Sequence, residues 1–358
     1  MKNILITGGA GFVGSSLAIK LKQSYANTKI VALDNLKRRG SELNIQRLRK
    51  HGIDFIHGDI RNQEDLMQID HVDLIIECSA EPSVLAGFDG SPAYVVNTNL
   101  VGTLNCLELA RRDQSDFIFV STSRVYPMKV INSLKYNEGE TRFVLLDKQD
   151  VVGASSQGFN EAFPLHGTRS LYGATKLASE YIIQEYLEMY NLRGVINRCG
   201  VITGPLQMGK VDQGVVVLWA ARHIYGGNLN YIGFGGAGKQ VRDILHIADL
   251  YNLIDVQMKM LDDISGEIFN VGGGLGISVS LKELTALCEG FSGRRIEIGS
   301  IVDDRAADIR IYITDNTKVT NVTGWAPRYG VHEIVEETVT WLKENEYQLR
   351  PILGVDNK

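Results

Sequence analysis

Short apolar runs alternate with segments of helical periodicity through the first third of the chain. Runs rich in Ile, Leu, Val and Phe predict five β-strands, at residues 4–7, 30–33, 55–57, 74–76 and 117–120. The segments between them have helical spacing or composition, at 12–22, 42–50, 64–69 and 94–111. Such alternation is typical of a parallel sheet with helices on both faces. Because crossover connections are right-handed, the pattern predicts an α/β fold with a doubly wound parallel sheet.

The pattern changes near residue 124. Residues 124–169 are polar and irregular, and a connection of that length is usually functional or disordered, so we expect it to lie over a site. A helix at 171–190 and a strand at 195–198 resume the alternation. Further helices are expected near 213–225, 248–261, 281–289 and 331–345.

Domain boundaries follow from this change of pattern. We predict a first domain at 1–199, to which residues of about 240–265 return. Residues 200–345 then form a smaller lobe, and 346–358 a C-terminal tail.

Composition narrows the class of protein. The chain has 358 residues, of which 44% are hydrophobic and 22% charged, as in soluble globular proteins. A net charge of −5 argues against nucleic acid as a partner, and the lack of a run of about 18 apolar residues argues against a membrane. The first strand leaves no room for a signal peptide, and the four scattered cysteines form no CxxC pair. We therefore expect a cytoplasmic protein with free thiols and no metal site.

A glycine triplet follows the first strand and opens a helix. Gly8, Gly11 and Gly14 have the spacing GxxGxxG, which permits a tight turn, close approach of backbone to a pyrophosphate, and close packing of helix on strand. Phe12 and Val13 begin the helix, whose N–H groups favour an anionic phosphate. The sequence predicts a dinucleotide site here.

The residue that ends the second strand indicates which dinucleotide. Asp34 follows Gly14 by 20 residues, where a carboxylate accepts both ribose hydroxyls of NAD and repels the extra phosphate of NADP. The basic residues at 37–39 would attract that phosphate, although a solvated basic turn is the simpler interpretation. We predict NAD. After the third strand, Asp59 and Ile60 either hold the adenine edge or form an ordinary strand end.

A YxxxK pair supplies candidate acid–base chemistry. Tyr172 and Lys176 lie four residues apart at the start of a helix, which places both on one face. Lowering the phenol pKa from about 10 to about 7 takes roughly 4 kcal/mol, which Lys176 and a nicotinamide cation would supply. Tyr25 and Lys29 repeat the pattern, but in the connection into the second strand. Thr122 ends the fifth strand, at the sheet edge where ligands bind.

Together these residues resemble the extended short-chain dehydrogenases/reductases, the NAD-dependent nucleotide-sugar epimerases and dehydratases, over about residues 1–345. The resemblance implies a Rossmann domain for NAD at 1–199, a substrate-binding lobe, and catalysis by Thr122, Tyr172 and Lys176. The expected cofactor residues are Gly8, Gly11, Phe12, Val13, Gly14, Asp34, Asn35, Asp59, Ile60, Ser79, Ala80, Asn99, Tyr172 and Lys176. The expected substrate residues are Arg124, Arg198, Gln213, Gln240, Arg242, Arg305 and Asp308.

Within that family, four stretches look most like the 2-epimerases of CDP-paratose and CDP-tyvelose, so a CDP-sugar is the favoured substrate. They are residues 121–126, 135–138, 212–214 and 238–243. Glu81 departs from the resemblance, because a small or amide residue is expected there. The implied reaction oxidises a sugar carbon, with C2 favoured, and returns the hydride to its opposite face.

Other functions stay open at this stage. A UDP-sugar 4-epimerase has the same acid–base requirements. A 4,6-dehydratase places an Asp-Glu pair after the strand-end threonine, where this chain has Ser123 and Arg124. A decarboxylase, a reductase and a non-catalytic NAD-binding module complete the alternatives. The resemblance also implies a homodimer through the helices at 94–111 and 171–190.

Overall fold

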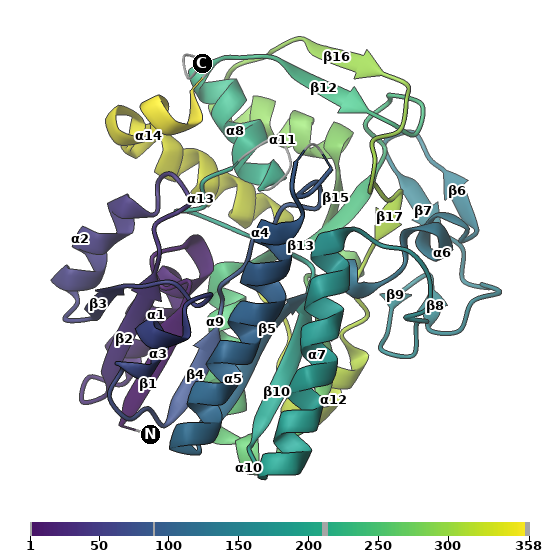
Figure 1. The fold of residues 1–358 in the computed structure, drawn as a ribbon. Helices are drawn as coiled ribbons and strands as arrows, with labels where there is room; N and C mark the ends of the chain where they lie inside the picture. The colour runs from purple at the N-terminus through teal and green to yellow at the C-terminus, as the bar shows by residue number, and fades with distance from the viewer. Residues whose placement is uncertain (1, 89, 210–213, 355–358) are drawn as a thin grey trace.

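A sheet of seven parallel strands runs through the molecule, as the computed structural model shows for residues 2–88, 90–209 and 214–354 (Figure 1). Its strand order is β14-β10-β5-β4-β1-β2-β3. The strands are β1 (Asn3–Thr7), β2 (Lys29–Asp34), β3 (Asp54–His57), β4 (Leu74–Glu77), β5 (Asp116–Thr122), β10 (Gly194–Cys199) and β14 (Ile268–Val271). The predicted doubly wound parallel sheet is confirmed.

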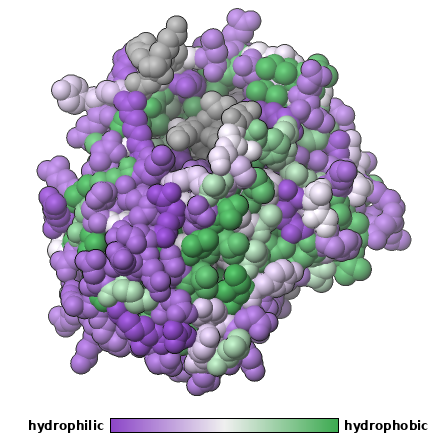
Figure 2. Space-filling model, viewed as in Figure 1, coloured by the Kyte–Doolittle hydropathy of each residue, from purple (hydrophilic) through white to green (hydrophobic). Residues whose placement is uncertain are grey.

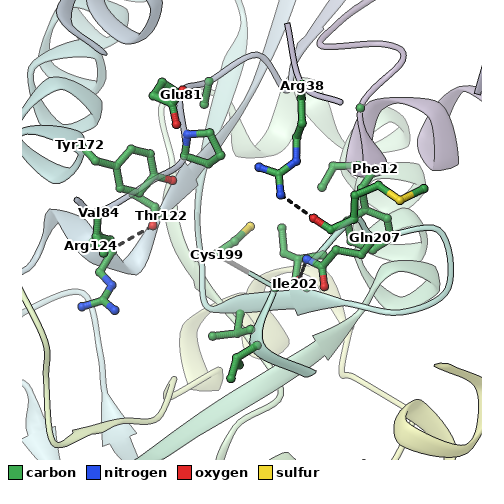
Figure 3. Close-up of a pocket in the computed structure, with 18 of the residues that line it drawn as sticks. Phe12, Arg38, Glu81, Val84, Thr122, Arg124, Tyr172, Cys199, Ile202 and Gln207 are labelled. Atoms are coloured by element: carbon green, nitrogen blue, oxygen red, sulfur yellow. Dashed lines mark hydrogen bonds between the residues drawn. The ribbon is translucent and has the colours of Figure 1, made fainter. Parts of the chain in front are cut away.

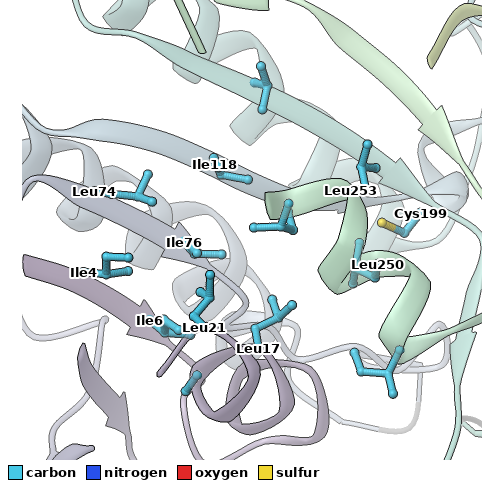
Figure 4. Packing of buried hydrophobic residues seen from close by; sticks show 14 of the residues in the cluster. Ile4, Ile6, Leu17, Leu21, Leu74, Ile76, Ile118, Cys199, Leu250 and Leu253 are labelled. Carbon is cyan, nitrogen blue, oxygen red and sulfur yellow. The ribbon is translucent and has the colours of Figure 1, made fainter. Parts of the chain in front are cut away.

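Helices cover both faces of this sheet because successive strand residues point to opposite sides. Ile4 and Ile6 of β1 pack with Leu17 and Leu250 on one face (Figure 4), whereas Leu5 belongs to the core on the other. The first face carries α1 (Phe12–Ser24), α2 (Glu42–Lys50), α9 (Ile247–Lys259), α10 (Leu261–Ile264) and α12 (Thr317–Thr323). The second carries α3 (Gln63–Met67), α5 (Gly102–Asp113) and α7 (Leu171–Tyr190). No helix in the described ranges is long and apolar enough to cross a membrane.

A π-helical turn interrupts the helix expected at 94–111. It spans Asn97–Val101, between α4 (Ala93–Val96) and α5. The Asn99 carbonyl accepts hydrogen bonds from Thr103 Oγ1 at 2.8 Å and from Ser179 Oγ of α7 at 2.7 Å. Such turns are frequent at functional sites, and this one fixes Asn99 against α7.

A second core lies in the C-terminal lobe, which sits above the carboxyl edge of the large sheet (Figure 1). Its helices are α8 (Val215–Tyr225), α11 (Leu281–Ser292), α13 (Val331–Glu344) and α14 (Glu346–Leu353). A smaller sheet is formed by β11 (Val201–Thr203), β13 (Val241–His246), β15 (Ser278–Ser280) and β17 (Ile311–Tyr312). The pair β12 (Leu229–Ile232) and β16 (Ile298–Ile301) lies at the periphery, and η3 (Leu275–Ile277) precedes β15.

The stretch 240–265 contributes to the core of the large sheet through α9, α10 and Leu245 of β13, although β13 pairs within the smaller sheet. The strand that joins the large sheet from this half of the chain is β14. Residues 346–353 are not a tail: they form α14, which buries Leu349 and Leu353 in the lobe core. So short a helix is marginal by itself and depends on the surface beneath it.

Apart from Arg124, which lines the cavity described below, the segment 124–170 packs beside the lobe. It contains η2 (Ser123–Val125), α6 (Met128–Asn132), β6 (Tyr136–Glu138), β7 (Phe143–Leu145), β8 (Ala154–Ser155) and β9 (Gly158–Phe159). Its aromatic rings join a core of their own, with Phe159 stacked 4.9 Å from Tyr312 of β17. These contacts explain how a polar, irregular stretch becomes ordered.

Candidate active site

A cavity of about 550 Å³ opens between the carboxyl edge of the large sheet and the lobe (Figure 3). It is of the size that holds a small molecule, and it lies where open α/β sheets bind ligands. Most of the residues predicted from the sequence line it: Gly8, Gly11, Phe12, Val13, Gly14, Asp34, Asn35, Ile60, Ser79, Ala80, Thr122, Arg124, Tyr172, Gln240, Arg242, Arg305 and Asp308. Asp59, Asn99, Lys176 and Arg198 do not line it, and Gln213 falls outside the described residues.

The glycine turn fits a dinucleotide because side chains are excluded from it. A Cβ atom on Gly14 would lie 2.3 Å from the carbonyl oxygen of Gly8, and one on Gly8 would lie 2.9 Å from the backbone of Cys78. Gly8 also has a φ of +63°, which favours glycine. Helix α1 begins directly after Gly11 with no side-chain cap, so its first N–H groups face the cavity as an anion site.

Asp34 is held at the edge of this turn. Its Oδ2 accepts hydrogen bonds from the N–H groups of Ala10 (3.1 Å) and Gly11 (3.2 Å), and its Oδ1 accepts one from Leu36 (2.7 Å). Burial raises the pKa of Asp34, and these three N–H donors oppose the rise. The carboxylate is thus oriented where a ribose would lie.

Some of the polar residues near Asp34 line the cavity, and others are engaged in contacts elsewhere in the protein. Asn35 Nδ2 donates to Asp59 Oδ2 at 2.9 Å, and Asp59 also pairs with Arg61 at 2.6 Å, which turns Asp59 away from the cavity. Arg38 lines the cavity, whereas Arg39 donates to the carbonyl of Pro351 at 3.0 Å. The basic turn is therefore only partly available to a ligand.

Thr122 and Tyr172 face each other across the floor of the cavity (Figure 3). Thr122 ends β5, and its Oγ1 accepts a hydrogen bond from the N–H of Arg124 at 3.2 Å. Tyr172 lies in the first turn of α7, which Ser170 caps. Burial raises the pKa of Tyr172, and its hydrogen bond with Thr122 opposes that rise only in part. The phenol is therefore protonated at neutral pH in this arrangement.

Lys176 lies beneath the cavity, one turn further along α7. Its ammonium is buried 3.6 Å from the centre of the Phe119 ring. Burial lowers the pKa of Lys176, opposed by the nearby carboxylates of Glu77 and Glu180. The lowering of the Tyr172 pKa expected from the sequence needs a nicotinamide cation together with Lys176; in the protein by itself, burial dominates and raises this pKa.

Asn99 clamps the cavity wall instead of lining it. Its Oδ1 accepts from the N–H of Glu81 at 2.7 Å, and its Nδ2 donates to the Glu81 carbonyl (3.1 Å) and to Thr175 Oγ1 (3.2 Å). Asn99 thereby ties the segment after β4 to helix α7.

Arg198, predicted to contact the substrate, makes buried contacts within the protein and does not line the cavity. Its Nη2 lies 2.7 Å from Glu180 Oε2, its Nη1 donates to the Tyr126 hydroxyl at 3.2 Å, and its side chain is 4% exposed. It lies on β10, next to the edge strand β14, and its side chain meets Glu180 of α7 instead of lining the cavity.

Arginines gather at the lobe end of the cavity. Arg242 pairs with Asp308 at 2.9 Å, and Arg124 donates to the carbonyl of Ala307 at 3.2 Å; Arg305 lies in the same segment. Burial lowers the pKa of Arg242 to about 10, against the opposing charge of Asp308, so it stays protonated at neutral pH. Three guanidinium groups in one cavity suit a diphosphate.

Several residues of the cavity were not predicted from the sequence. They include Glu81, Cys199, Ile202, Trp219 and Asn230. No motif or spacing marks the last four: Cys199 ends β10 of the large sheet, and Ile202, Trp219 and Asn230 come from segments that meet it only in the folded protein. Glu81 had a signal, its departure from the family resemblance.

The fold and this cavity define a dinucleotide-binding α/β protein with an acid–base group at the edge of its sheet. Comparisons with known proteins narrow the class. The model of the NAD dependent epimerase/dehydratase family matches residues 4–272. CDP-paratose 2-epimerase of Salmonella typhi is 32% identical over 349 residues, which are 94% of this chain and 98% of that protein.

Solved structures agree with this assignment. UDP-glucose 4-epimerase of Thermotoga maritima with UDP-glucose has a TM-score of 0.77 at 25% identity, and covers 96% of this chain and 99% of its own. dTDP-glucose 4,6-dehydratase of Bacillus anthracis in complex with NAD has a TM-score of 0.75 at 27% identity, over 98% of this chain and all of its own (100%). The chain belongs to the NAD-dependent epimerase/dehydratase family, and NAD is its cofactor.

The placement of Arg198 leads to a prediction about stability. Arg198→Ala leaves the Glu180 carboxylate buried without its partner, so we expect the free energy of unfolding to fall by about 3–5 kcal/mol. Urea denaturation measures this loss. Arg350→Ala, which removes a half-exposed pair with Glu346, should cost less than about 1 kcal/mol. A stable Arg198→Ala protein with weakened nucleotide binding would instead support the substrate role.

Proposed function

We propose that this protein epimerises a nucleotide sugar through a transient ketone, and that it acts at C2 of a CDP-sugar of the paratose or tyvelose type. The observation that carries the proposal is one cavity that joins the glycine turn, the Thr122–Tyr172 pair and the arginines of the lobe. The 2-epimerase from Salmonella typhi, similar over nearly the whole chain, supports the choice of sugar.

The residues that would hold NAD are those of the glycine turn, with Asp34 at the ribose. Gly8, Gly11 and Gly14 leave room for the pyrophosphate against α1. Bound there, NAD would supply a reversible hydride acceptor for the sugar carbon, so the reaction would need no other oxidant.

Tyr172 is placed to move the proton in the same reaction. Its phenolate would take the proton of the sugar hydroxyl, and its phenol would return that proton when the carbinol forms again. Thr122 donates to or accepts from the reacting oxygen. Because burial raises the Tyr172 pKa and Arg124 is the nearby cation that opposes this rise, the phenolate would depend on further positive charge from the bound cofactor, with Lys176 one turn below on α7. The arginines would hold the diphosphate while the ketone turns its other face.

The alternatives differ in what they require of these residues. A 4-epimerase uses the same acid–base pair with a different sugar pose, and is the closest rival, given the similarity to UDP-glucose 4-epimerase. A 4,6-dehydratase needs a further acid and base after Thr122, where Ser123 and Arg124 stand. A non-catalytic NAD-binding protein has no need of Tyr172 beside Thr122.

The proposed reaction is tested by incubating the protein with CDP-, UDP-, GDP- and dTDP-sugars in deuterated buffer and following the products by NMR. We expect inversion at one carbon of a CDP-sugar with no deuterium there, because the hydride returns directly. Deuterium at the inverted carbon would indicate proton abstraction, and inversion at C4 of a UDP-sugar would favour the rival.

The role of Tyr172 is tested by Tyr172→Phe. We expect bound NAD to be retained and turnover to fall by about 100-fold or more, since only the proton-transfer group is removed. Absorbance of bound dinucleotide and a coupled turnover assay measure the two properties. Tyr25→Phe, in the other YxxxK match, should keep its activity; full activity of Tyr172→Phe would remove this residue from the mechanism.

We also propose a homodimer through α5 and α7. Apolar side chains gather on the face that these helices present (Figure 2), and Leu104, Tyr181 and Met189 are 36%, 53% and 68% exposed. By contrast, Leu107 and Ile183 of the same helices are buried against the sheet. Exposed apolar patches of this kind mark interfaces.

Sedimentation equilibrium tests the dimer. We expect twice the mass of one chain for the native protein and the mass of one chain for Leu104→Glu, because the substitution places charge in the interface. Leu275→Glu, at a leucine of similar exposure (41%) in the lobe, should leave the dimer intact. A native protein with the mass of one chain would contradict this proposal.

A further inference from the structure

One carboxylate in the cavity has no role in the mechanism above. Glu81 lies in the segment after β4, and Figure 3 shows its side chain on the same side of the cavity as the phenol of Tyr172. Pro82, Val84 and Leu85 follow it and line the same wall. The charge of Glu81 is therefore set into a largely apolar surface.

The backbone holds this carboxylate in place. Asn99 binds both the N–H and the carbonyl of Glu81, at 2.7 and 3.1 Å, and ties them to α7. The side-chain Oε1 accepts a hydrogen bond from the N–H of Ser83 at 3.2 Å. The described residues supply no partner for the other oxygen, Oε2, and no cation within ion-pair distance.

The two other acidic side chains that line the described cavity are already engaged. Asp34 accepts three backbone N–H groups at the glycine turn, and Asp308 pairs with Arg242 at 2.9 Å. Both lie at sites for the nucleotide parts of the ligands. Glu81 differs, since it stands beside Tyr172 with an acceptor to spare.

A carboxylate in such a place favours a neutral hydrogen-bond donor and repels an anion. A sugar hydroxyl next to the reacting carbon is that donor, and the apolar wall limits competition by water. We propose that Glu81 accepts a hydrogen bond from a glycosyl hydroxyl and thereby selects a neutral, hydroxylated sugar over a uronic acid. This inference rests on the proposed function only in taking a nucleotide sugar as the ligand.

The test uses Glu81→Gln, which keeps the backbone clamp and an Oε1 acceptor for Ser83 but removes the charge. Glu64→Gln, at an exposed position in α3, is the control. Calorimetry on the NAD-loaded protein gives the dissociation constants of CDP and CDP-glucose, and of UDP and UDP-glucose. The variants are then measured with the pair of ligands, cytidine or uridine, that the native protein binds more tightly.

We expect Glu81→Gln to raise the dissociation constant of the nucleoside diphosphate glucose by about 10-fold, as for loss of a charge-assisted hydrogen bond. The dissociation constant of the nucleoside diphosphate alone should change by less than about twofold. UDP-glucuronate should bind Glu81→Gln at least about threefold more tightly than the native protein, because a repulsive charge is gone. If Glu81→Gln weakens the binding of the nucleoside diphosphate glucose and of the nucleoside diphosphate equally, Glu81 has only a structural role and the proposal is overturned. No change in any ligand would overturn it as well.

The outcome is separable from that of the proposed function. If the NMR panel shows no epimerised product while Glu81→Gln still weakens only the binding of the nucleoside diphosphate glucose, the proposed reaction fails and the role of Glu81 stands. If epimerisation is found and that binding is unaffected by Glu81→Gln, the reaction stands and the role of Glu81 fails.

Discussion

The common direction of the seven strands is the constraint on which the site depends. Because every strand of the large sheet is parallel, the residues that end them open at one edge, and each crossover returns a helix beneath that edge. Gly8, Asp34, Ser79, Thr122 and Cys199 are far apart in sequence, yet each follows or ends a strand and lines one cavity. The lobe closes the opposite side.

Burial controls the electrostatics of this cavity. The Tyr172 pKa is raised and the Lys176 pKa lowered, each because its charged form loses solvation. Below them the fully buried Glu77 has its pKa raised to about 7 by the same effect, against the Lys176 charge and a hydrogen bond from Thr103. The protein alone therefore keeps the phenol neutral, and a cationic cofactor beside it would complete the charge balance.

Two arginines illustrate how tertiary structure assigns a role. Arg198 and Arg242 both follow from the same family resemblance. Arg198 lies on β10 of the large sheet, with the same orientation as Ile196, so it points at α7 and meets Glu180. Arg242 lies on β13 of the smaller sheet and borders the cavity beside Asp308. The position of each strand in the fold decides whether its arginine forms a buried ion pair or borders the cavity.

Local signals were enough for much of this protein. The alternation of strands and helices, the glycine triplet and the YxxxK pair in context indicate the sheet, its cofactor edge and the position of Tyr172, because these depend on residues close in sequence. Other features depend on contacts between segments that are distant in sequence. They are the order of the lobe, the return of β14, the packing of α14 and of the segment 124–170, and the exposure of Glu81 beside Tyr172. Those contacts are decided by which surfaces bury one another, and periodicity along a single segment does not encode its partner.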